Sequence, residues 1–235
     1  MEKAVEKTVT CPKCQGEGKF TVYGSINSVQ DPELTEKLKN LSLFDYTCPH
    51  CNARVTFDYG LLYHDMDKRI MIYYKRKEAD AKKVADMFLG RGIYDVAEDL
   101  QGKYLYRVVR RKRQLREKIA IFDANLDDRY MELAKLFYLT KFEADYPDLE
   151  AEWIYIYGKD GVFYIAFSTK EGEISTNFDM AVYTHMKEVF PELSDSLRGG
   201  EVFIDQEWAM KQMNNRTMGD LLTGAVGSDL KITIS

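Results

Sequence analysis

Short stretches in which apolar and polar residues alternate recur along the chain, and this alternation is typical of β-strands. The segment 153–167 alternates on both sides of Gly158-Lys159-Asp160-Gly161, whose glycines and aspartate suit a tight turn, so a hairpin is predicted there. Residues 61–68 are interpreted as a turn that joins strands 55–59 and 69–74 into another hairpin. Further strands are predicted at 20–24, 103–109, 173–176, 202–204 and 230–234.

Elsewhere apolar residues recur every three or four positions, which predicts amphipathic helices. The most regular run predicts a helix over about 126–141 and consists of Leu126, Tyr130, Leu133, Ala134 and Phe137. Asp31 followed by Pro32 is typical of a helix start, so another helix is expected to begin there. The remaining helices are predicted at 75–89, 113–122, 177–190 and 205–213.

All four cysteines of the chain lie in two matching pairs, Cys11-Pro12-Lys13-Cys14 and Cys48-Pro49-His50-Cys51, separated by thirty-three residues. A Cys-x-x-Cys turn can aim both sulfurs at one ion, and two such turns supply the four thiolates that tetrahedral Zn²⁺ prefers. The proline in each pair presets the backbone φ angle that such a turn needs. The sequence therefore predicts a structural zinc site with Cys11, Cys14, Cys48 and Cys51 as ligands.

Other uses of the cysteines remain open at this point: two disulfides, a redox-active pair, or a catalytic zinc. A catalytic zinc usually keeps a water ligand, whereas four thiolates leave no open position. A redox cysteine of low pKa typically sits at a helix N-terminus, and neither pair clearly precedes a helix. His50 can replace a cysteine as a ligand, although a histidine at this place more often points to solvent. A structural site is the favoured interpretation.

The composition is that of a soluble protein. The chain has 235 residues, a net charge of −5 and 30% charged residues. Its apolar runs are all shorter than the roughly 18 residues that a membrane span requires, and residues 1–10 lack the apolar core of an export signal. A cytoplasmic protein is therefore expected, and reduced thiols in the cytoplasm favour metal over disulfide.

A second hypothesis is a metal-dependent or acid–base enzyme. His64 and Asp65 combine an imidazole and a carboxylate in the predicted turn, and such a pair can serve as a general base. Asp127 and Asp128, with Glu132, supply carboxylates of the kind that hold Mg²⁺ or Mn²⁺, and Glu117 and His64 would add to them. The structural alternatives are local hydrogen bonding in an aspartate-stabilised turn and acids that complement a helix start. The enzyme hypothesis requires the fold to bring these groups together.

A third hypothesis is nucleic-acid binding through the basic segment 107–118. Its arginines could neutralise phosphates, which would give salt-dependent binding. Most such runs are solvated helix faces, and the acidic net charge disfavours a chain devoted to nucleic acid. The candidate contacts are Arg107, Arg110, Arg111 and Arg113.

Further motifs accompany the cysteine pairs. They are Asp31-Pro32-Glu33-Leu34, Leu61-Leu62-Tyr63-His64-Asp65, Glu117-Lys118-Ile119, Ile121-Phe122 and Leu126-Asp127-Asp128-Arg129. With the cysteine pairs, this arrangement resembles the bacterial and archaeal CpXC family, which is named for paired Cys-Pro-x-Cys motifs. The resemblance covers about the first 140 residues; it implies a zinc-ribbon-like domain and supplies no reaction.

The two Cys-Pro-x-Cys turns, which we also call knuckles, depart from a common pattern at the residue that follows each cysteine pair. Rubredoxin-type turns usually place glycine there, because the position takes a positive φ angle. This chain has Gln15 and Asn52 instead. Asparagine tolerates the left-handed conformation better than glutamine does, so more backbone strain is expected in the first knuckle than in the second.

The sequence therefore predicts an α+β protein in two parts. Residues 1–142 form a zinc-ribbon-like domain with a helical insertion, followed by helices. Residues 143–235 form an α+β region with an antiparallel β-meander, and the boundary lies at the acidic run around Pro147. The favoured function is a cytoplasmic binding, adaptor or regulatory module that carries structural Zn²⁺. It is expected to contact a protein partner or a second copy of itself, and no membrane.

Overall fold

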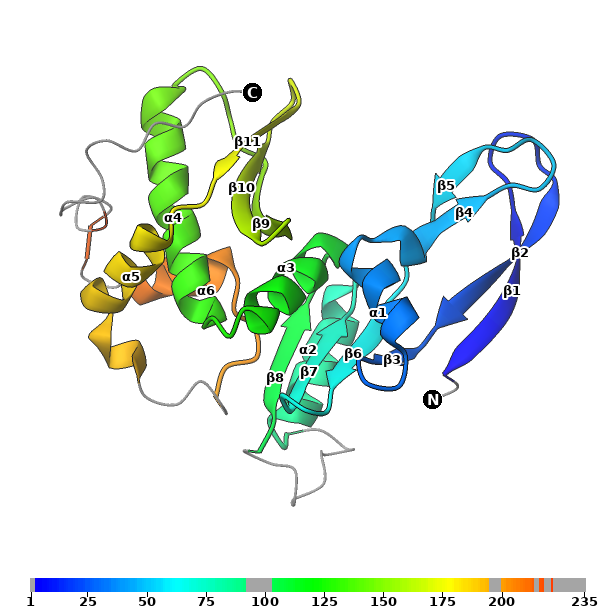
Figure 1. Cartoon of the computed structure of the whole chain (residues 1–235), viewed down its shortest axis with the longest axis horizontal. Helices are drawn as coiled ribbons and strands as arrows, with labels where there is room; N and C mark the ends of the chain where they lie inside the picture. The colour runs from blue at the N-terminus through cyan, green and yellow to red at the C-terminus, as the bar shows by residue number, and fades with distance from the viewer. Residues whose placement is uncertain (1–2, 92–102, 195–199, 214–215, 218–220, 222–235) are drawn as a thin grey trace. The chain divides into compact units, whose positions relative to one another are not determined.

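The computed structural model describes residues 3–91, 103–194, 200–213, 216–217 and 221. The chain divides into two compact units, Met1–Arg116 with Arg198–Val202 and Glu117–Leu197 with Phe203–Ser235 (Figure 1). Both units contain helices and β-strands, which confirms the α+β class. The domain boundary after residue 142 stays a prediction, and the strand predicted at 230–234 lies outside the described residues.

A four-stranded mixed sheet forms the centre of the first unit. Its strands lie in the order β3 (Ser25–Asn27), β6 (Leu61–Asp65), β7 (Ile70–Tyr74) and β8 (Leu105–Val109). Strand β3 runs parallel to β6, β6 antiparallel to β7, and β7 parallel to β8. Neighbouring residues on a strand face opposite sides of the sheet, so each face can pack against its own helices.

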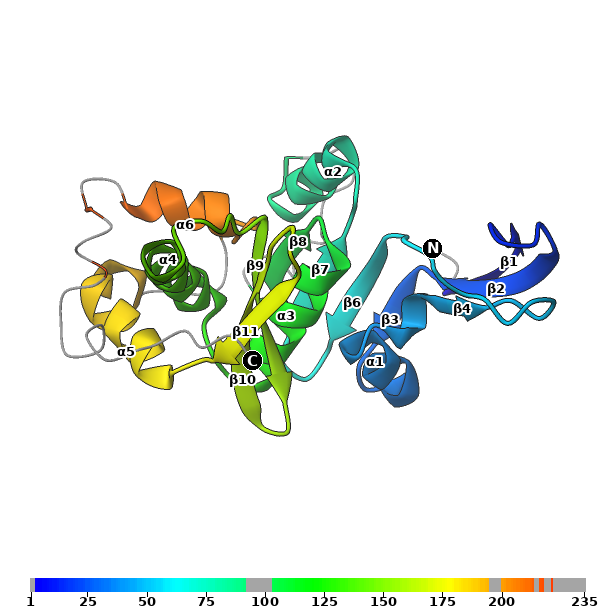
Figure 2. The same ribbon diagram turned by 90° about the horizontal axis from the view of Figure 1, so that it is seen from above.

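Helices cover both faces of this sheet. On one face, Phe88 of α2 (Glu78–Phe88) contacts the rings of Tyr73 and Tyr106. On the other face, Tyr74 contacts Phe44, which ends the 3₁₀ turn η1 (Ser42–Phe44) after α1 (Pro32–Lys39). Figure 2 shows α2 and α1 on opposite sides of the sheet. The helix predicted from Asp31-Pro32 is thus confirmed.

The hairpin predicted between strands 55–59 and 69–74 is wrong. Residues 61–65 form strand β6 instead of a turn, and they pair with β7. Their burial alternates, with Leu61, Tyr63 and Asp65 buried and the residues between them partly exposed. Burial of that alternating face makes Leu61–Asp65 a strand in spite of the polar residues that follow it.

Two small hairpins carry the cysteines, and we call them together the cysteine module. They are β1 (Ala4–Thr10) with β2 (Glu17–Tyr23), and β4 (Asp45–Thr47) with β5 (Arg54–Thr56). Their shared core consists of Cys11, Phe20, Tyr46 and Cys48. Strand β1 was not predicted, because its exposed Glu6 and Lys7 interrupt the alternation of apolar and polar residues. The module adjoins the sheet where Leu62 N–H donates to the Gly24 carbonyl (3.0 Å).

The second unit has its own antiparallel sheet, in the order β11-β10-β9. The predicted C-terminal meander is confirmed, and its strands are β9 (Trp153–Lys159), β10 (Val162–Ser168) and β11 (Glu173–Asn177). The turn between β9 and β10 has positive φ at Asp160 (51°) and Gly161 (78°), as a type I′ turn requires. The helices are α3 (Lys112–Asp123), which begins in the first unit, α4 (Asp128–Asp145), α5 (Met180–Val189), η3 (Pro191–Ser194) and α6 (Gln206–Met213).

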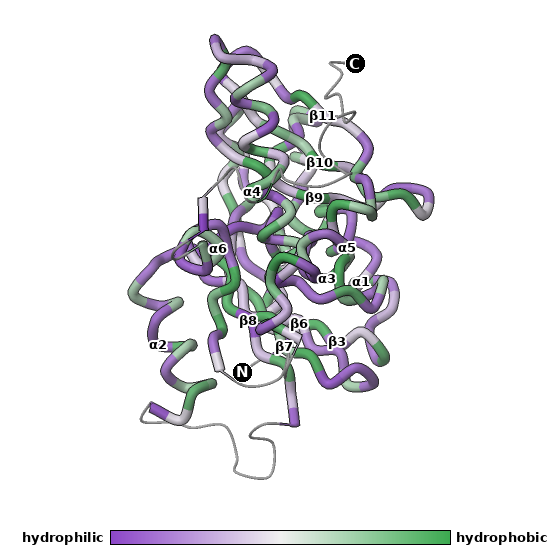
Figure 3. Tube along the Cα trace, turned by 90° about the vertical axis from the view of Figure 1, so that its left-hand side faces the viewer, coloured by the Kyte–Doolittle hydropathy of each residue, from purple (hydrophilic) through white to green (hydrophobic). Residues whose placement is uncertain are grey.

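Helix α4 is the centre of the second unit. Every residue from Tyr130 to Tyr138 is buried, because β9, α5 and α6 all pack against the helix. The predicted helix is confirmed, whereas the expectation that it buries one side is wrong. Figure 3 shows hydrophilic and hydrophobic residues interspersed along it, so charged groups are enclosed as well as apolar ones.

Two smaller expectations in the second half of the chain are corrected. The helix predicted from residue 177 begins at Met180, and Asp179 rather than Asn177 caps it by accepting from Ala181 N–H (2.8 Å). Residues 202–204 do not form a strand, although the Val202 carbonyl accepts from Val108 N–H (2.9 Å). Among the described residues, no helix is long and apolar enough to cross a membrane.

Candidate metal centre

The four cysteine sulfurs converge between the two hairpins of the cysteine module. All four Sγ atoms lie within 4.8 Å of one another. Two pairs lie in hydrogen-bonding geometry, Cys11 with Cys51 (3.8 Å) and Cys14 with Cys48 (3.7 Å), and both pairs join one hairpin to the other. The structure thus brings together the ligand set that the sequence predicts.

Matching backbone hydrogen bonds build the two turns. In the first turn Gln15 N–H donates to the Cys11 carbonyl (2.9 Å), and in the second Asn52 N–H donates to the Cys48 carbonyl (3.0 Å). Gln15 and Asn52 both have positive φ, 58° and 56°. The first turn therefore holds a glutamine in the left-handed conformation, which costs roughly 1–2 kcal/mol for a residue with a Cβ.

His50 ties the second turn to the first hairpin instead of pointing its nitrogen at the sulfurs. Its Nε2 lies 2.8 Å from the Glu17 carbonyl, so this nitrogen carries the proton and donates. The ring lies over Gly16, where a Cβ would come within 2.6 Å of His50 Cδ2. The cluster of possible metal ligands contains the four cysteines and leaves His50 out.

The surroundings of the sulfurs change their acidity in opposite directions. The backbone N–H of Cys14 does most to lower the pKa of Cys11, to about 6, against the effect of burial. The backbone N–H of Gly16 also lowers the pKa of Cys14, but the Cys51 sulfur, burial and the other two sulfurs outweigh it and raise that pKa to about 12. Four thiolates this close repel one another, so a divalent cation is needed to keep all of them ionised.

A metal ion fits the space between the sulfurs. A zinc–sulfur bond is about 2.3 Å long, which gives a tetrahedron with edges of roughly 3.8 Å. The distances of 3.7 and 3.8 Å between the hairpins match that edge. They far exceed the length of a disulfide bond, about 2.05 Å, and all four thiols are free. The four cysteines can therefore hold a metal ion.

Comparison with known protein families matches residues 9–135 to the family described as CpXC protein. This match spans more than half of the 235 residues and contains both cysteine pairs. The chain belongs to the CpXC family. The resemblance seen in the motifs is thus confirmed. Searches of curated proteins and of solved structures found no match to this CpXC chain.

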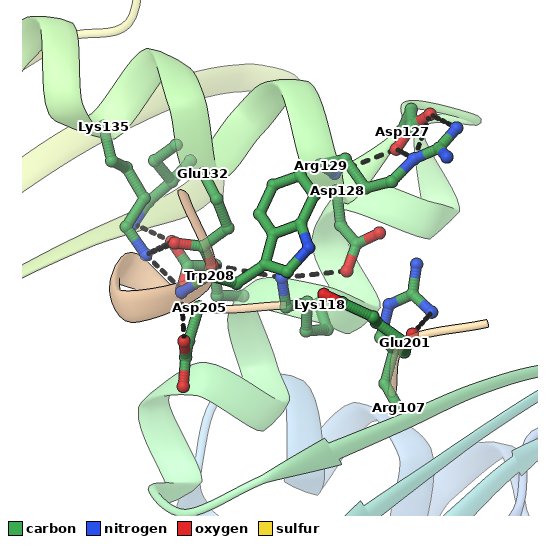
Figure 4. Close-up of polar contacts among 12 residues, drawn as sticks. Arg107, Lys118, Asp127, Asp128, Arg129, Glu132, Lys135, Glu201, Asp205 and Trp208 are labelled. Carbon is green, nitrogen blue, oxygen red and sulfur yellow. Dashed lines mark hydrogen bonds and ion pairs between the residues drawn. The ribbon is translucent and has the colours of Figure 1, made fainter. Parts of the chain in front are cut away.

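The CpXC match also contains five buried charged residues on α3 and α4, which we call the buried charge cluster: Glu117, Lys118, Asp128, Glu132 and Lys135. Figure 4 labels Lys118, Asp128, Glu132 and Lys135. Lys118 Nζ lies 2.9 Å from Asp128 Oδ2 and 3.1 Å from Glu132 Oε1. Lys135 Nζ lies 2.9 Å from Glu132 Oε2 and 3.1 Å from Glu117 Oε1. None of the five side chains is more than 4% exposed. Two lysines of the chain itself thus pair with these three carboxylates.

The cluster also reaches the sheet of the second unit. Glu117 Oε1 accepts from Ile156 N–H on β9 (2.7 Å). Burial raises the pKa of Glu117, although Lys135 opposes this and Glu132 adds to it. Burial disfavours the charged form of Lys118, but Asp128 and Glu132 outweigh it and raise the pKa of Lys118. Glu117 therefore sits in a less favourable place for a negative charge than Glu132, whose pKa the two lysines lower against the effect of burial.

Sequence reasoning considered these carboxylates as metal ligands or helix-start acids and missed their burial. A signal was present, because Asp128, Glu132 and Lys135 follow one another at spacings of four and three and so share one face of α4. Apolar residues fill the neighbouring positions of the same helix. Charges with helical spacing inside an apolar run predict a buried ion-pair set.

His64 and Asp65 lie next to each other on strand β6. Their side chains therefore leave opposite faces of the sheet. His64 Nε2 lies 3.2 Å from the Tyr104 hydroxyl, and burial lowers the pKa of the imidazole, partly offset by Asp65. Asp65 is buried and accepts from Lys68 N–H (2.9 Å), which stabilises the turn after β6. The predicted turn position of His64 is therefore wrong.

Asp127 acts as the N-cap of α4. Its Oδ1 accepts from Arg129 N–H (2.9 Å), and its Oδ2 lies 2.7 Å from Arg129 Nη2. The same Nη2 donates to the Leu193 carbonyl (2.7 Å), so the pair joins α4 to η3. The first unit contains His64 and Asp65, and the second contains Glu117, Asp127 and Asp128. A site that combines the two groups stays a prediction.

The basic segment is divided among several environments. Arg107 is buried and donates to the Tyr106 carbonyl (2.8 Å). Arg110 lies 3.4 Å from Glu78 of α2. Arg111 and Arg113 are exposed, although both have contacts within the chain. The four arginines of this CpXC chain therefore do not share one exposed surface, and nucleic-acid binding stays a prediction.

Proposed function

We propose that the chain is a structural zinc protein in which Zn²⁺ closes the cysteine module into a zinc ribbon. The observation that carries this proposal is the convergence of four free thiols with 3.7 and 3.8 Å between sulfurs of opposite hairpins. Sulfur ligands in a tetrahedral set suit zinc. Four thiolates leave no position for a water ligand, so the ion stabilises the fold and activates no substrate.

The small size of the module supports a structural role. Its core has four buried residues, two of which are the ligands Cys11 and Cys48. Two-stranded hairpins of this kind are marginally stable by themselves in water. A metal ion that joins them supplies folding free energy directly, because the site exists only in the folded chain.

We infer a binding or adaptor role for the protein as a whole. The cysteines satisfy the metal completely, and lysines hold the carboxylates of Glu117 and Asp128 in ion pairs. The partner is a protein or a second copy of the chain, in a reducing compartment such as the cytoplasm, where thiols persist. Light scattering of the zinc-loaded chain and affinity capture test this role. A monomer that captures no protein contradicts it.

Metal content and ligand geometry test the zinc site. The purified chain should contain one zinc per molecule by mass spectrometry. After exchange for Co²⁺, its absorption spectrum should be that of a tetrahedral four-thiolate site. The absence of metal, or a spectrum with fewer than four thiolates, contradicts the proposal. Iron in place of zinc preserves the ligand set but refutes the choice of metal.

Two neighbouring substitutions in the second turn make a matched pair. Cys48→Ser removes a ligand and should abolish stoichiometric zinc binding. His50→Ala removes the contact with Glu17 but no ligand, so one zinc per chain should remain. Loss of zinc from both variants to the same extent would show that the turn itself, and not the ligand set, decides binding.

A further inference from the structure

We propose that this metal centre is also a site of oxidative modification: a peroxide oxidises Cys14, a disulfide forms between Cys14 and Cys48, and the zinc is released. This inference rests on the proposed zinc function and adds its regulation. It predicts a specific bond between the two hairpins, in place of the bond within one Cys-x-x-Cys pair that spacing alone suggests. Exposure and pairing of the sulfurs carry the inference.

Exposure singles out one of the four cysteines. Cys14 is exposed, whereas Cys11 and Cys48 are buried and Cys51 is intermediate. A small oxidant from solvent therefore meets residue Cys14 first, because oxidation of thiolates follows their accessibility. A zinc ligand is a thiolate at neutral pH, which is the reactive form of cysteine.

Pairing then decides which sulfur completes the reaction. Cys14 Sγ lies 3.7 Å from Cys48 Sγ, and the second close pair, Cys11 with Cys51, also joins the two hairpins. The backbone hydrogen bonds of the first turn, Gln15 N–H to Cys11 O and Cys11 N–H to Gly16 O, hold that turn in its own shape. To form a disulfide between the hairpins, the neighbouring sulfurs of Cys14 and Cys48 need to move only a short distance toward each other.

The chemistry balances with hydrogen peroxide as the oxidant. The Cys14 thiolate attacks one peroxide oxygen, the O–O bond breaks, and hydroxide leaves and takes up a proton, so that Cys14 becomes a sulfenic acid. The Cys48 thiolate attacks the Cys14 sulfur, the S–O bond breaks, and a second hydroxide leaves as water. Two thiolates have then given two electrons to one peroxide. Zinc has lost two of its four ligands.

The oxidised module keeps its shape in outline, because the new bond joins the hairpins that the metal joined. A thiol reductant should reverse the reaction and allow zinc to bind again. The site would thus exchange one cross-link, the metal, for another, the disulfide, according to the oxidant present.

The experiment uses the full zinc-loaded chain and increasing amounts of hydrogen peroxide. A chromogenic chelator measures released zinc, and mass spectrometry of alkylated, unreduced peptides identifies the disulfides. One zinc per chain should be released as Cys14 becomes linked to Cys48. A dimedone trap added with the peroxide should label Cys14 before the other cysteines.

Two variants with the same ligand chemistry separate the oxidation from the loss of a ligand. Cys14→His and Cys51→His each leave three thiolates and one imidazole, a set that also holds zinc. Cys51→His keeps the reacting pair and should release zinc as the wild-type chain does, whereas Cys14→His should retain zinc under peroxide. If either variant fails to bind zinc, disulfide mapping in the wild-type chain still decides.

Several results would overturn the inference. These are disulfides within the pairs, Cys11 with Cys14 or Cys48 with Cys51, first labelling of another cysteine, and retention of zinc in excess peroxide. Each of them leaves the proposed zinc function intact. A chain that contains no zinc before any oxidant is added refutes the proposed function instead, so the two failures are distinct.

Discussion

In the cysteine module four sulfurs converge between two hairpins, whereas in the second unit three carboxylates and two ammonium groups converge on α3 and α4. The four thiolates repel one another when they are ionised, and so do the three carboxylates. Within the described part of the module no lysine or arginine is buried, but the second unit contributes Lys118 and Lys135. Closely packed anions need counter-cations. Lysines supply them in the second unit, and the metal ion that we propose would supply one in the cysteine module.

The two regions also differ in the size of their buried cores. The module encloses four buried residues, while helix α4 alone is enclosed from Tyr130 to Tyr138. Apolar burial therefore contributes more to the second unit, and the module, as we propose, depends on an ion from solution. This difference predicts which changes each region tolerates.

Removal of the metal should have the largest effect. Chelation, or replacement of Cys14 or Cys48 by Ser, should unfold at least the first sixty residues, because structural zinc contributes roughly 10–16 kcal/mol in comparable peptides. Amide hydrogen exchange would show lost protection in β1, β2, β4 and β5 and retained protection in α4. Unchanged protection and melting temperature after complete zinc removal would contradict the comparison.

Loss of one buried ammonium group should come next. Lys118→Met removes the ammonium group that pairs with Asp128 and Glu132. It should lower the free energy of unfolding by about 3–5 kcal/mol. Both tryptophans of the chain lie in the second unit, so their fluorescence during urea unfolding reports that unit alone. Lys141→Met, which breaks a pair with Asp145 nearer the surface, is the control and should cost about 1 kcal/mol or less. Equal costs would show that burial of the pairs is irrelevant.

Replacing Glu117 by glutamine should have a smaller effect on the free energy of unfolding, and this effect should depend on pH. The pKa of Glu117 is raised above its ordinary value of 4.5, so the folded chain keeps this proton after the unfolded chain has lost it. The contribution of Glu117 to wild-type stability therefore falls as pH rises from about 4.5 to the raised pKa, by roughly 1.4 kcal/mol per pKa unit. Glu117→Gln lacks this loss and can still accept from Ile156 N–H.

Urea unfolding between pH 4 and 8 measures this difference. The stability of Glu117→Gln relative to wild type should increase with pH and then level off. Glu150→Gln, at an exposed position, should show no such trend. Parallel curves for Glu117→Gln and wild type would mean that the folded and unfolded chains hold the Glu117 proton equally.

Backbone changes in the two regions should have the smallest effects, with opposite signs. Gln15→Gly relieves a φ of 58° in the first knuckle and should strengthen zinc binding by about 1 kcal/mol. Gly161→Ala introduces a Cβ at a φ of 78° in the β9–β10 turn and should destabilise the second unit by about 1 kcal/mol. Chelator competition measures the first and urea unfolding the second. A loss of zinc affinity in Gln15→Gly would show that the glutamine side chain itself supports the turn.

Local signals explain which parts of the fold could be predicted. The cysteine pairs, the Asp31-Pro32 helix start and the Asp160-Gly161 turn each depend on a few neighbouring residues, and all three are found in the structure. The cysteine cluster needed one further inference, that two distant pairs meet. Matching turns with matching prolines were sufficient for it.

Features that depend on distant neighbours could not be predicted. Strand β6 is defined by its partners β3 and β7, and its charged end beside Asp65 resembles a turn when considered by itself. The burial of Lys118 and Lys135 depends on the packing of α3 against α4, which no single segment encodes. For the same reason the sequence did not predict that Asp65 and His64 face opposite sides of the sheet, since this follows from their places on strand β6.

The hydrogen bond from Leu62 N–H to Gly24 O bears on how the proposed ion would bind. It lies where β3 and β6 pair, so in the folded chain the two hairpins leave the sheet from a common base. The sulfur pairs then meet at a high effective concentration, and part of the entropy of closing the long connection has already been lost to the sheet. In the whole chain the sheet and the proposed ion therefore hold the two hairpins together, whereas the same hairpins excised as separate peptides would have to be gathered by the ion alone.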